Sequence, residues 1–193
     1  MHQPDYRDDA GIMKMPWVFL HAIKDYFDMP WMLARHPNIK ATFNITCPLI
    51  EQLKLYYDAP ESHDYFLSLW LQDTKTLHES QLQWMIKLCK SAQYDTMVSS
   101  LPYFKTLYEK TEYESQELFD MQVLFILSWC GVYLREHNDL VKELIAKEKD
   151  FNQDDKQRLL KELAQFVKSI FEYYILLAKE ARICVNPKVE IFG

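Results

Sequence analysis

Residues 115–136 place the strongest constraint on how this chain can fold. Apolar side chains occupy nearly every position from residue 118 to residue 129, so all faces of a helix there would be apolar. Such a helix must be buried on most sides. We therefore expect other helices to surround it, with Ser115 capping its start. An unpaired polar group in its core would cost roughly 1–3 kcal/mol. Three polar side chains therefore need partners: Asp120, Gln122 and Ser128.

Prolines mark where other helices can begin or break. Pro16, Pro48 and Pro102 each precede a helical pattern, and proline is well tolerated in a first helical turn. Pro30 falls inside such a pattern, where the missing N–H is expected to kink or split the helix. Asn152 is expected to cap the last helix. The further predicted helices cover residues 17–34, 48–57, 63–72, 79–91, 102–110, 139–147 and 153–179.

Two short segments read as strands, at residues 41–46 and 182–185. The first is apolar, contains Thr and Ile, and is bounded by Pro37 and Pro48. Only three glycines occur in 193 residues, which disfavours tight hairpins and glycine-rich phosphate loops. The predicted order is therefore loop, helix, strand, a long run of helices, and a second strand.

Composition excludes several classes of protein. The formal net charge is −6, so no general basic surface for nucleic acid is offered. The longest apolar stretch, residues 121–134, falls short of the ~20 residues that span a bilayer, and no membrane partner is expected. No secretion signal is visible at the start. Four widely spaced cysteines suit reduced thiols, and we expect a cytoplasmic location: Cys47, Cys89, Cys130 and Cys184.

No motif for a metal or cofactor is present. The sequence has no His-Glu-x-x-His pattern and no nucleophile elbow, so neither a zinc hydrolase nor a serine hydrolase is indicated. His21 stands among Leu20, Ala22 and Ile23 and is expected to be a core or interface histidine. Aromatic residues at helical spacing are expected in the core. No pair of catalytic carboxylates can be nominated, and we expect no cofactor and no metal.

Three motifs near the start occur in a distinctive order. They are His2-Gln3-Pro4, the run Pro-Trp-Val-x-Leu-His-Ala-Ile-Lys-Asp-Tyr at residues 16–26, and Asn-Ile-Lys-Ala-Thr-Phe-Asn at residues 38–44. Together they resemble the N-terminal part of glycoside hydrolase family 57, especially its α-amylase-like members. The helix around residues 119–129 resembles the family's Asp-Leu-Gln-Val-x-Phe-x-Leu-x-Trp helix, and the likeness continues to near Pro187.

The resemblance implies a mostly helical α/β fold. It would be a partial (β/α) barrel of the family's (β/α)7 type, with a large helical insertion between two short parallel strands. Residues 1–47 would start the barrel with the His-Gln-Pro loop, a helix and a strand. Residues 48–179 would form the helical insertion. Residues 180–193 would hold the second strand and a divergent C-terminal end.

The resemblance also implies a function. His2 would bond to a glucose hydroxyl, with Gln3 and Asp5 beside it in the substrate site. The activity would be that of a retaining glycoside hydrolase on α-glucans or maltooligosaccharides, of the α-amylase or 4-α-glucanotransferase type.

The family's nucleophile Glu and acid/base Asp have no counterpart in these residues. Ala181 and Cys184 replace a Gly and a Glu that the family usually has. We therefore expect a truncated, N-terminal fragment that is inactive alone, whose standing as an enzyme is open. A companion chain could carry the rest of the barrel.

An alternative remains at this point. The chain could be a non-catalytic helical protein-interaction module. Asp120, Gln122 and Trp129 would then specify its core and take no part in binding sugar.

Overall fold

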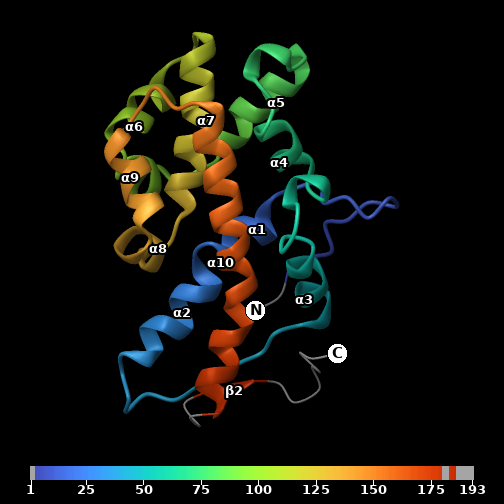
Figure 1. Cartoon of the computed structure of the whole chain (residues 1–193), viewed down its shortest axis with the longest axis vertical. Coiled ribbons are helices and arrows are strands. Elements are labelled where there is room, and N and C mark those ends of the chain that lie inside the picture. The colour runs from blue at the N-terminus through green and yellow to red at the C-terminus, as the bar shows by residue number, and fades with distance from the viewer. Residues whose placement is uncertain (1–2, 180–182, 186–193) are drawn as a thin grey trace.

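Helix α10 (Gln153–Lys179) runs along the length of the molecule and packs against helices from both halves of the chain (Figure 1). This computed structural model describes residues 3–179 and 183–185. The predicted start and end of α10 are confirmed. Asn152 Oδ1 accepts a hydrogen bond from Asp155 N at 3.0 Å, and Asp155 Oδ2 accepts one from Asn152 N at 2.9 Å, which closes a reciprocal cap.

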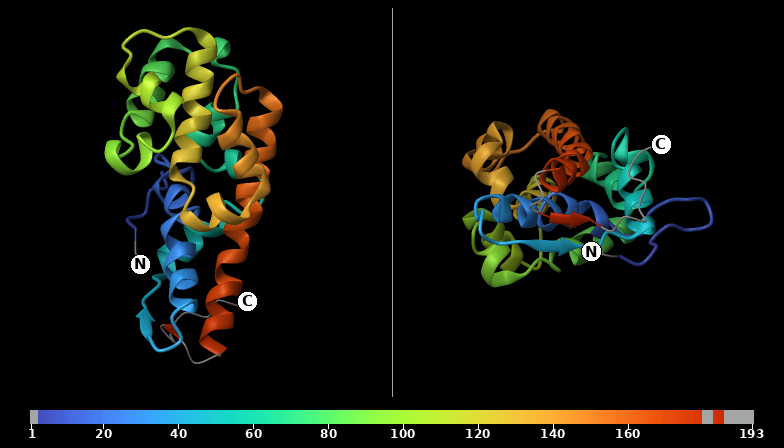
Figure 2. Two further views of the ribbon diagram at one scale, coloured as in Figure 1. Left: turned by 90° about the vertical axis from the view of Figure 1, so that its left-hand side faces the viewer. Right: turned by 90° about the horizontal axis from the view of Figure 1, so that it is seen from below.

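The described part of the chain is mostly helical. Figure 2 shows the two short strands at one end of the molecule and α5 and α6 at the other. No described helix is both long enough and apolar enough to cross a membrane. The remaining helices are α1 (Trp17–Ala22), α2 (Asp25–Ala34), α3 (Cys47–Lys54), η1 (Pro60–Ser62), α4 (Tyr65–Trp70), η2 (Thr74–Thr76), α5 (Glu79–Cys89), η3 (Tyr94–Val98), α6 (Pro102–Glu109), α7 (Ser115–Trp129), α8 (Val132–His137) and α9 (Asp139–Lys147).

Helix α7 is the buried centre that the sequence predicts. Its side chains are buried from Phe119 to Trp129 without interruption. Asp120 accepts hydrogen bonds from Gln116 and from the amides of residues 150 and 151. Gln122 Oε1 accepts one from Lys156, and Ser128 Oγ donates to the Phe125 carbonyl. The expectation that these three polar groups have partners is confirmed.

The predicted single helix over residues 115–136 is wrong, because the chain breaks at Cys130–Gly131. Gly131 N donates to the Ile23 carbonyl at 2.9 Å, and the Asp28 carboxylate accepts from Val132 N and Tyr133 N at 2.7 and 3.1 Å. A Cβ at Gly131 would lie only 2.4 Å from Asp28 Oδ2, so this approach requires glycine. The start also differs: Glu114, not Ser115, caps α7 in a capping box with Glu117.

The predicted break at Pro30 is also misplaced. The chain breaks at Ile23 and Lys24 instead, and Pro30 lies inside α2. Proline leaves the carbonyl four residues earlier without its usual N–H donor. That carbonyl belongs to Tyr26, and it accepts a hydrogen bond from the Tyr174 hydroxyl of α10 at 2.7 Å. The side chain of α10 thus replaces the missing backbone bond and keeps α2 intact.

The two strands pair, and the first is shorter than the sequence predicts, while residue 182 of the second lies outside the described residues. Strands β1 (Ala41–Phe43) and β2 (Ile183–Val185) run parallel, with Ala41 opposite Ile183 and Phe43 opposite Val185. Strand β1 ends early because Thr46 already takes the N-cap position of α3. Within residues 3–179 and 183–185 the sheet has these two strands and no barrel forms. The barrel therefore stays a prediction.

Lys156 is an unusual member of the core, with 0% of its surface exposed. Its ammonium donates to the Trp70 carbonyl at 2.7 Å and to Gln122 Oε1 at 2.6 Å, and lies 3.8 Å from the ring centre of Phe119. None of the ion pairs among the described residues includes it. Burial therefore lowers the pKa of Lys156 to about 7.

The Tyr174 hydroxyl should contribute to stability because of Pro30. We expect Tyr174→Phe to lower the free energy of unfolding by roughly 1–2 kcal/mol, since it leaves the Tyr26 carbonyl unpaired. In a Pro30→Ala background the restored N–H can bond that carbonyl, so the same substitution should cost less. Urea denaturation of the four proteins measures the difference. Equal costs in both backgrounds would contradict this account.

Replacing Lys156 by Met should change how stability responds to pH. The pKa is about 7 in the folded chain against an ordinary value of 10.5. Between these values the unfolded chain binds more protons than the folded chain, so the wild type gains stability as the pH rises. The destabilisation that results from burying Lys156 is therefore largest below pH 7. From pH 7 to 8.5 the wild type should gain roughly 1–2 kcal/mol relative to Lys156→Met. Parallel urea titrations at the two pH values test this; identical pH responses would contradict it.

Candidate functional site

The loop before α1 is tied to the body of the protein by a buried glutamine. Gln52 on α3 has 0% exposure, and its Nε2 donates to the carbonyls of Pro4 and Pro48, each at 3.1 Å. Its Oε1 accepts from Tyr6 N at 3.0 Å. Further along, Met13 N donates to the His63 carbonyl at 2.8 Å. The segment that carries the predicted site is therefore held in place at Pro4 and Tyr6.

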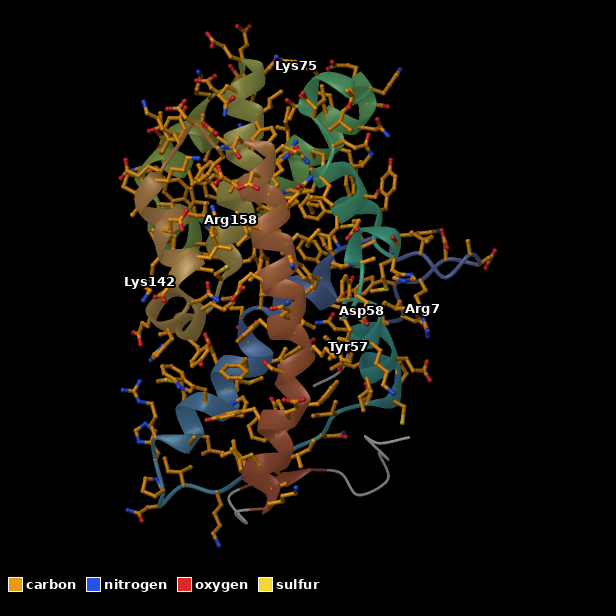
Figure 3. The ribbon with its side chains drawn as sticks, in the orientation of Figure 1. Arg7, Tyr57, Asp58, Lys75, Lys142 and Arg158 are labelled. Atoms are coloured by element: carbon orange, nitrogen blue, oxygen red, sulfur yellow. The ribbon has the colours of Figure 1, made fainter. Side chains whose placement is uncertain are left out.

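The three predicted substrate residues have different surroundings. His2 lies outside the described residues. Asp5 is exposed and forms a two-pronged ion pair with Arg7, with bonds of 2.9 and 2.6 Å to Nε and Nη2. These bonds to Arg7 lower the pKa of Asp5 to about 2. Arg7 also reaches Glu51 Oε2 at 3.3 Å and is labelled on the protruding loop in Figure 3. A sugar at Asp5 would have to share its carboxylate with Arg7.

Gln3 faces inward, toward the start of α2. Its Oε1 accepts a hydrogen bond from the Tyr6 hydroxyl at 3.1 Å. Burial raises the pKa of Tyr26, and a weak hydrogen bond with the neighbouring Gln3 side chain offsets a part of that shift. Gln3 therefore lies beside Tyr26, at the point where α1 gives way to α2.

A group of polar and aromatic side chains gathers at this point, and we call His21, Asp25, Tyr26 and Trp129 the junction cluster. His21 and Asp25 lie on either side of the break between α1 and α2, and Nδ1 of the histidine is 2.6 Å from Asp25 Oδ2. The hydrogen bond from His21 lowers the pKa of Asp25, with a further contribution from Lys24, whose Nζ is 3.3 Å from the other carboxylate oxygen. Asp25 is thus a carboxylate at neutral pH.

Aromatic rings surround the His21 imidazole. The ring of Tyr26 stacks at 5.9 Å between centroids, and the ring of Trp129 meets it edge-on at 5.4 Å. Trp17 adds a second indole at 6.0 Å from Trp129, and the Lys24 ammonium lies 5.5 Å from the Trp129 ring. The break between α1 and α2 and the end of α7 bring these residues together.

Two buried donors of the junction cluster lack a hydrogen bond of good geometry. Tyr26 is 5% exposed and Trp129 is 9% exposed. Within the described part of the chain, neither the Tyr26 hydroxyl nor Trp129 Nε1 forms a hydrogen bond of good geometry. Buried polar groups are almost always paired, and each unpaired one costs roughly 1–3 kcal/mol. Two such donors flanking one imidazole fit a site whose acceptors come from a ligand.

The chemistry of the junction cluster suits a neutral, hydroxyl-rich molecule. Tyr26 and Trp129 offer donors, His21 offers its second ring nitrogen, and the indoles of Trp17 and Trp129 offer apolar faces. Retaining glycoside hydrolysis needs two carboxylates roughly 5–5.5 Å apart. Asp25 is bound to His21 and Lys24, while the next acid on α2, Asp28, caps α8. Among the described residues no group of three His, Cys, Asp or Glu side chains is placed to hold a metal ion.

From the sequence, His21 was expected to be a core or interface histidine, and Asp25 was not singled out. His21 is half-buried, with 32% of its side chain exposed. The signal that could have found the pair is the four-residue spacing of His21 and Asp25, which puts both on one helical face. Nothing local could reveal Trp129 as their neighbour, because it comes from a helix more than a hundred residues later.

The described chain is mostly helical, and its histidine–carboxylate pair lies against one tyrosine ring and one tryptophan ring. The family model of Glycosyl hydrolase family 57 matches residues 1–171 of the 193-residue chain. The chain therefore belongs to glycosyl hydrolase family 57, and the resemblance seen in its motifs is confirmed. No curated protein and no solved structure matches it.

Proposed function

We propose that this chain binds α-glucans, as the N-terminal part of the catalytic domain of a retaining glycoside hydrolase of the α-amylase or 4-α-glucanotransferase type. The observation that carries the proposal is the pair of unpartnered buried donors, Tyr26 Oη and Trp129 Nε1, on either side of His21. A glucose ring supplies both hydroxyl oxygens to accept from them and an apolar face to lie on an indole.

The N-terminal loop extends the proposed site. Gln3 lies beside Tyr26, so the residues next to it in the His-Gln-Pro motif would approach the same ligand. In this proposal His2 and Gln3 bind the sugar that occupies the junction cluster. Asp5, held by Arg7, binds a neighbouring unit at the rim.

We further propose that the chain alone does not cleave glucan. The family's nucleophile Glu and acid/base Asp have no counterpart in the sequence, and Asp25 is committed to His21. The acids would come from a companion polypeptide that adds strands to the β1–β2 sheet. Two-stranded sheets are marginal alone, and parallel ones are normally covered. Exposed Met29, Met32 and Ile39 on and after α2 offer apolar surface for such a partner.

Removing either of these two donors should weaken sugar binding. Trp129→Phe keeps an aromatic ring but removes Nε1, and Tyr26→Phe removes only the hydroxyl. Each should raise the Kd for maltoheptaose by about 3- to 10-fold, the value of one hydrogen bond. Tyr26→Phe should change the free energy of unfolding by less than about 1 kcal/mol, whereas Trp129→Phe should lower it, because the smaller ring gives up contacts with Trp17 and His21. Calorimetric titration and urea denaturation measure the two quantities.

The same measurements separate this proposal from its alternatives. Unchanged affinity of both variants for maltoheptaose would show that the junction cluster takes no part in binding sugar. No affinity of the wild type for maltoheptaose, together with tight binding of a protein partner, would favour the helical interaction module. Release of reducing sugar from starch by the purified chain would refute the statement that it lacks catalytic acids.

A further inference from the structure

A hollow lies between α10 and the loop that joins α3 to η1. It has a volume of about 560 Å³, within the roughly 300–1,000 Å³ of small-molecule sites. Its apolar floor consists of Pro60, Leu160 and Ala164, which are buried, with Leu71 beside them. Figure 3 labels Tyr57 and Asp58 beside the middle of α10. We call this hollow the α10 groove.

The polar side chains that line the α10 groove have no partner within the protein. In residues 3–179 and 183–185, none of the hydrogen bonds or ion pairs involves these side chains. The unpaired side chains are Asp58, Glu61, Gln157, Lys161 and Gln165. Two carboxylates, two amides and one ammonium thus face one hollow with their hydrogen-bonding capacity unused.

The spacing of these groups along α10 favours an elongated ligand. Gln157, Lys161 and Gln165 follow one another at four-residue steps, so they form a row on one helical face. At a rise of about 1.5 Å per residue the row extends about 12 Å. Opposite this row stand Tyr57 and Asp58 on the loop. A ligand in the groove would therefore be contacted at several points along its length.

The charges and the aromatic ring narrow the class of ligand. One ammonium against two carboxylates gives no net attraction for an anion. Tyr57 supplies a half-buried aromatic face, and burial, followed by the charge of Glu172, raises its pKa to about 12, so the hydroxyl stays protonated and able to donate. An aromatic face combined with amides and carboxylates that accept from hydroxyls is suited to sugar rings.

The loop that carries Tyr57 is held in a costly conformation. Ala59 has φ 50° and ψ 57°, the left-handed region that non-glycine residues rarely adopt. The next residue, Pro60, starts η1 and is buried on the floor of the groove. The wall of the groove is thus formed by backbone that the surrounding structure fixes.

We propose that the α10 groove is a second carbohydrate-binding site, which takes a linear run of neutral sugar units. It shares no residue with the junction cluster, so it would hold a separate segment of chain or a separate molecule. The choice of an α-glucan as that chain rests on the proposed function. The groove has its own lining of unpaired polar side chains, which does not depend on the junction cluster.

The test is a titration of the full chain with maltoheptaose, followed by NMR of glutamine side-chain amides and by calorimetry. We expect the Gln157 and Gln165 signals to shift. Tyr57→Ala and the double variant Gln157→Ala/Gln165→Ala should each weaken binding at the groove about fivefold or more. The double variant changes exposed residues only, so it guards against misfolding of Tyr57→Ala. Gln83→Ala, an exposed glutamine on α5 outside the groove, should bind like the wild type.

The outcomes separate this inference from the proposed function. Repeating the titration with Trp129→Phe should leave the Gln157 and Gln165 shifts intact. If those shifts occur while Trp129→Phe and Tyr26→Phe bind like the wild type, the α10 groove is supported as a sugar site and the junction cluster is contradicted as one. If maltoheptaose leaves both glutamine signals unmoved, the groove proposal is overturned, even when the junction cluster binds. Tetralysine shifting those signals in place of maltoheptaose would also overturn it.

Discussion

The contact between Asp28 and the start of α8 determines how the two halves of the chain meet. The carboxylate accepts two backbone hydrogen bonds from residues 132 and 133, and burial raises its pKa against the lowering effect of those amides. Gly131 permits the approach and donates to the Ile23 carbonyl. As a result α7 ends with Trp129 beside His21. Without this contact, the junction cluster would have neither its indole wall nor one of its unpartnered donors.

Local signals in the sequence were sufficient for some elements and not for others. The bounds of α9 and α10 agree with the prediction, because side-chain caps and amphipathic spacing lie within each segment. The breaks at Lys24 and Cys130–Gly131 were missed because they are joined by a distant contact, the hydrogen bond from Gly131 N to the Ile23 carbonyl. Propensity placed the break at Pro30, where a hydroxyl from α10 compensates for the proline.

In the candidate site, too, some features follow from local sequence and others only from distant contacts. The three early motifs were enough to place the chain in its family and to draw attention to Gln3 and Asp5. The partner of Asp5 is Arg7, two residues away, which a local reading could have found. The junction cluster joins residues from α1, α2 and α7, and only the tertiary fold reveals that two of its donors are unsatisfied. The α10 groove likewise joins a loop near residue 58 to a helix a hundred residues later.

The bond from Tyr174 to the Tyr26 carbonyl fixes the axial register of α2 against α10. A slip of one turn would move the hydroxyl about 5.4 Å from the only carbonyl that Pro30 leaves open. The two side chains are therefore coupled: without Pro30 the Tyr26 carbonyl regains a backbone donor, and without Tyr174 it loses the hydroxyl that replaces that donor. A substitution at Tyr174 would therefore shift the Tyr26 ring without changing any residue of the junction cluster.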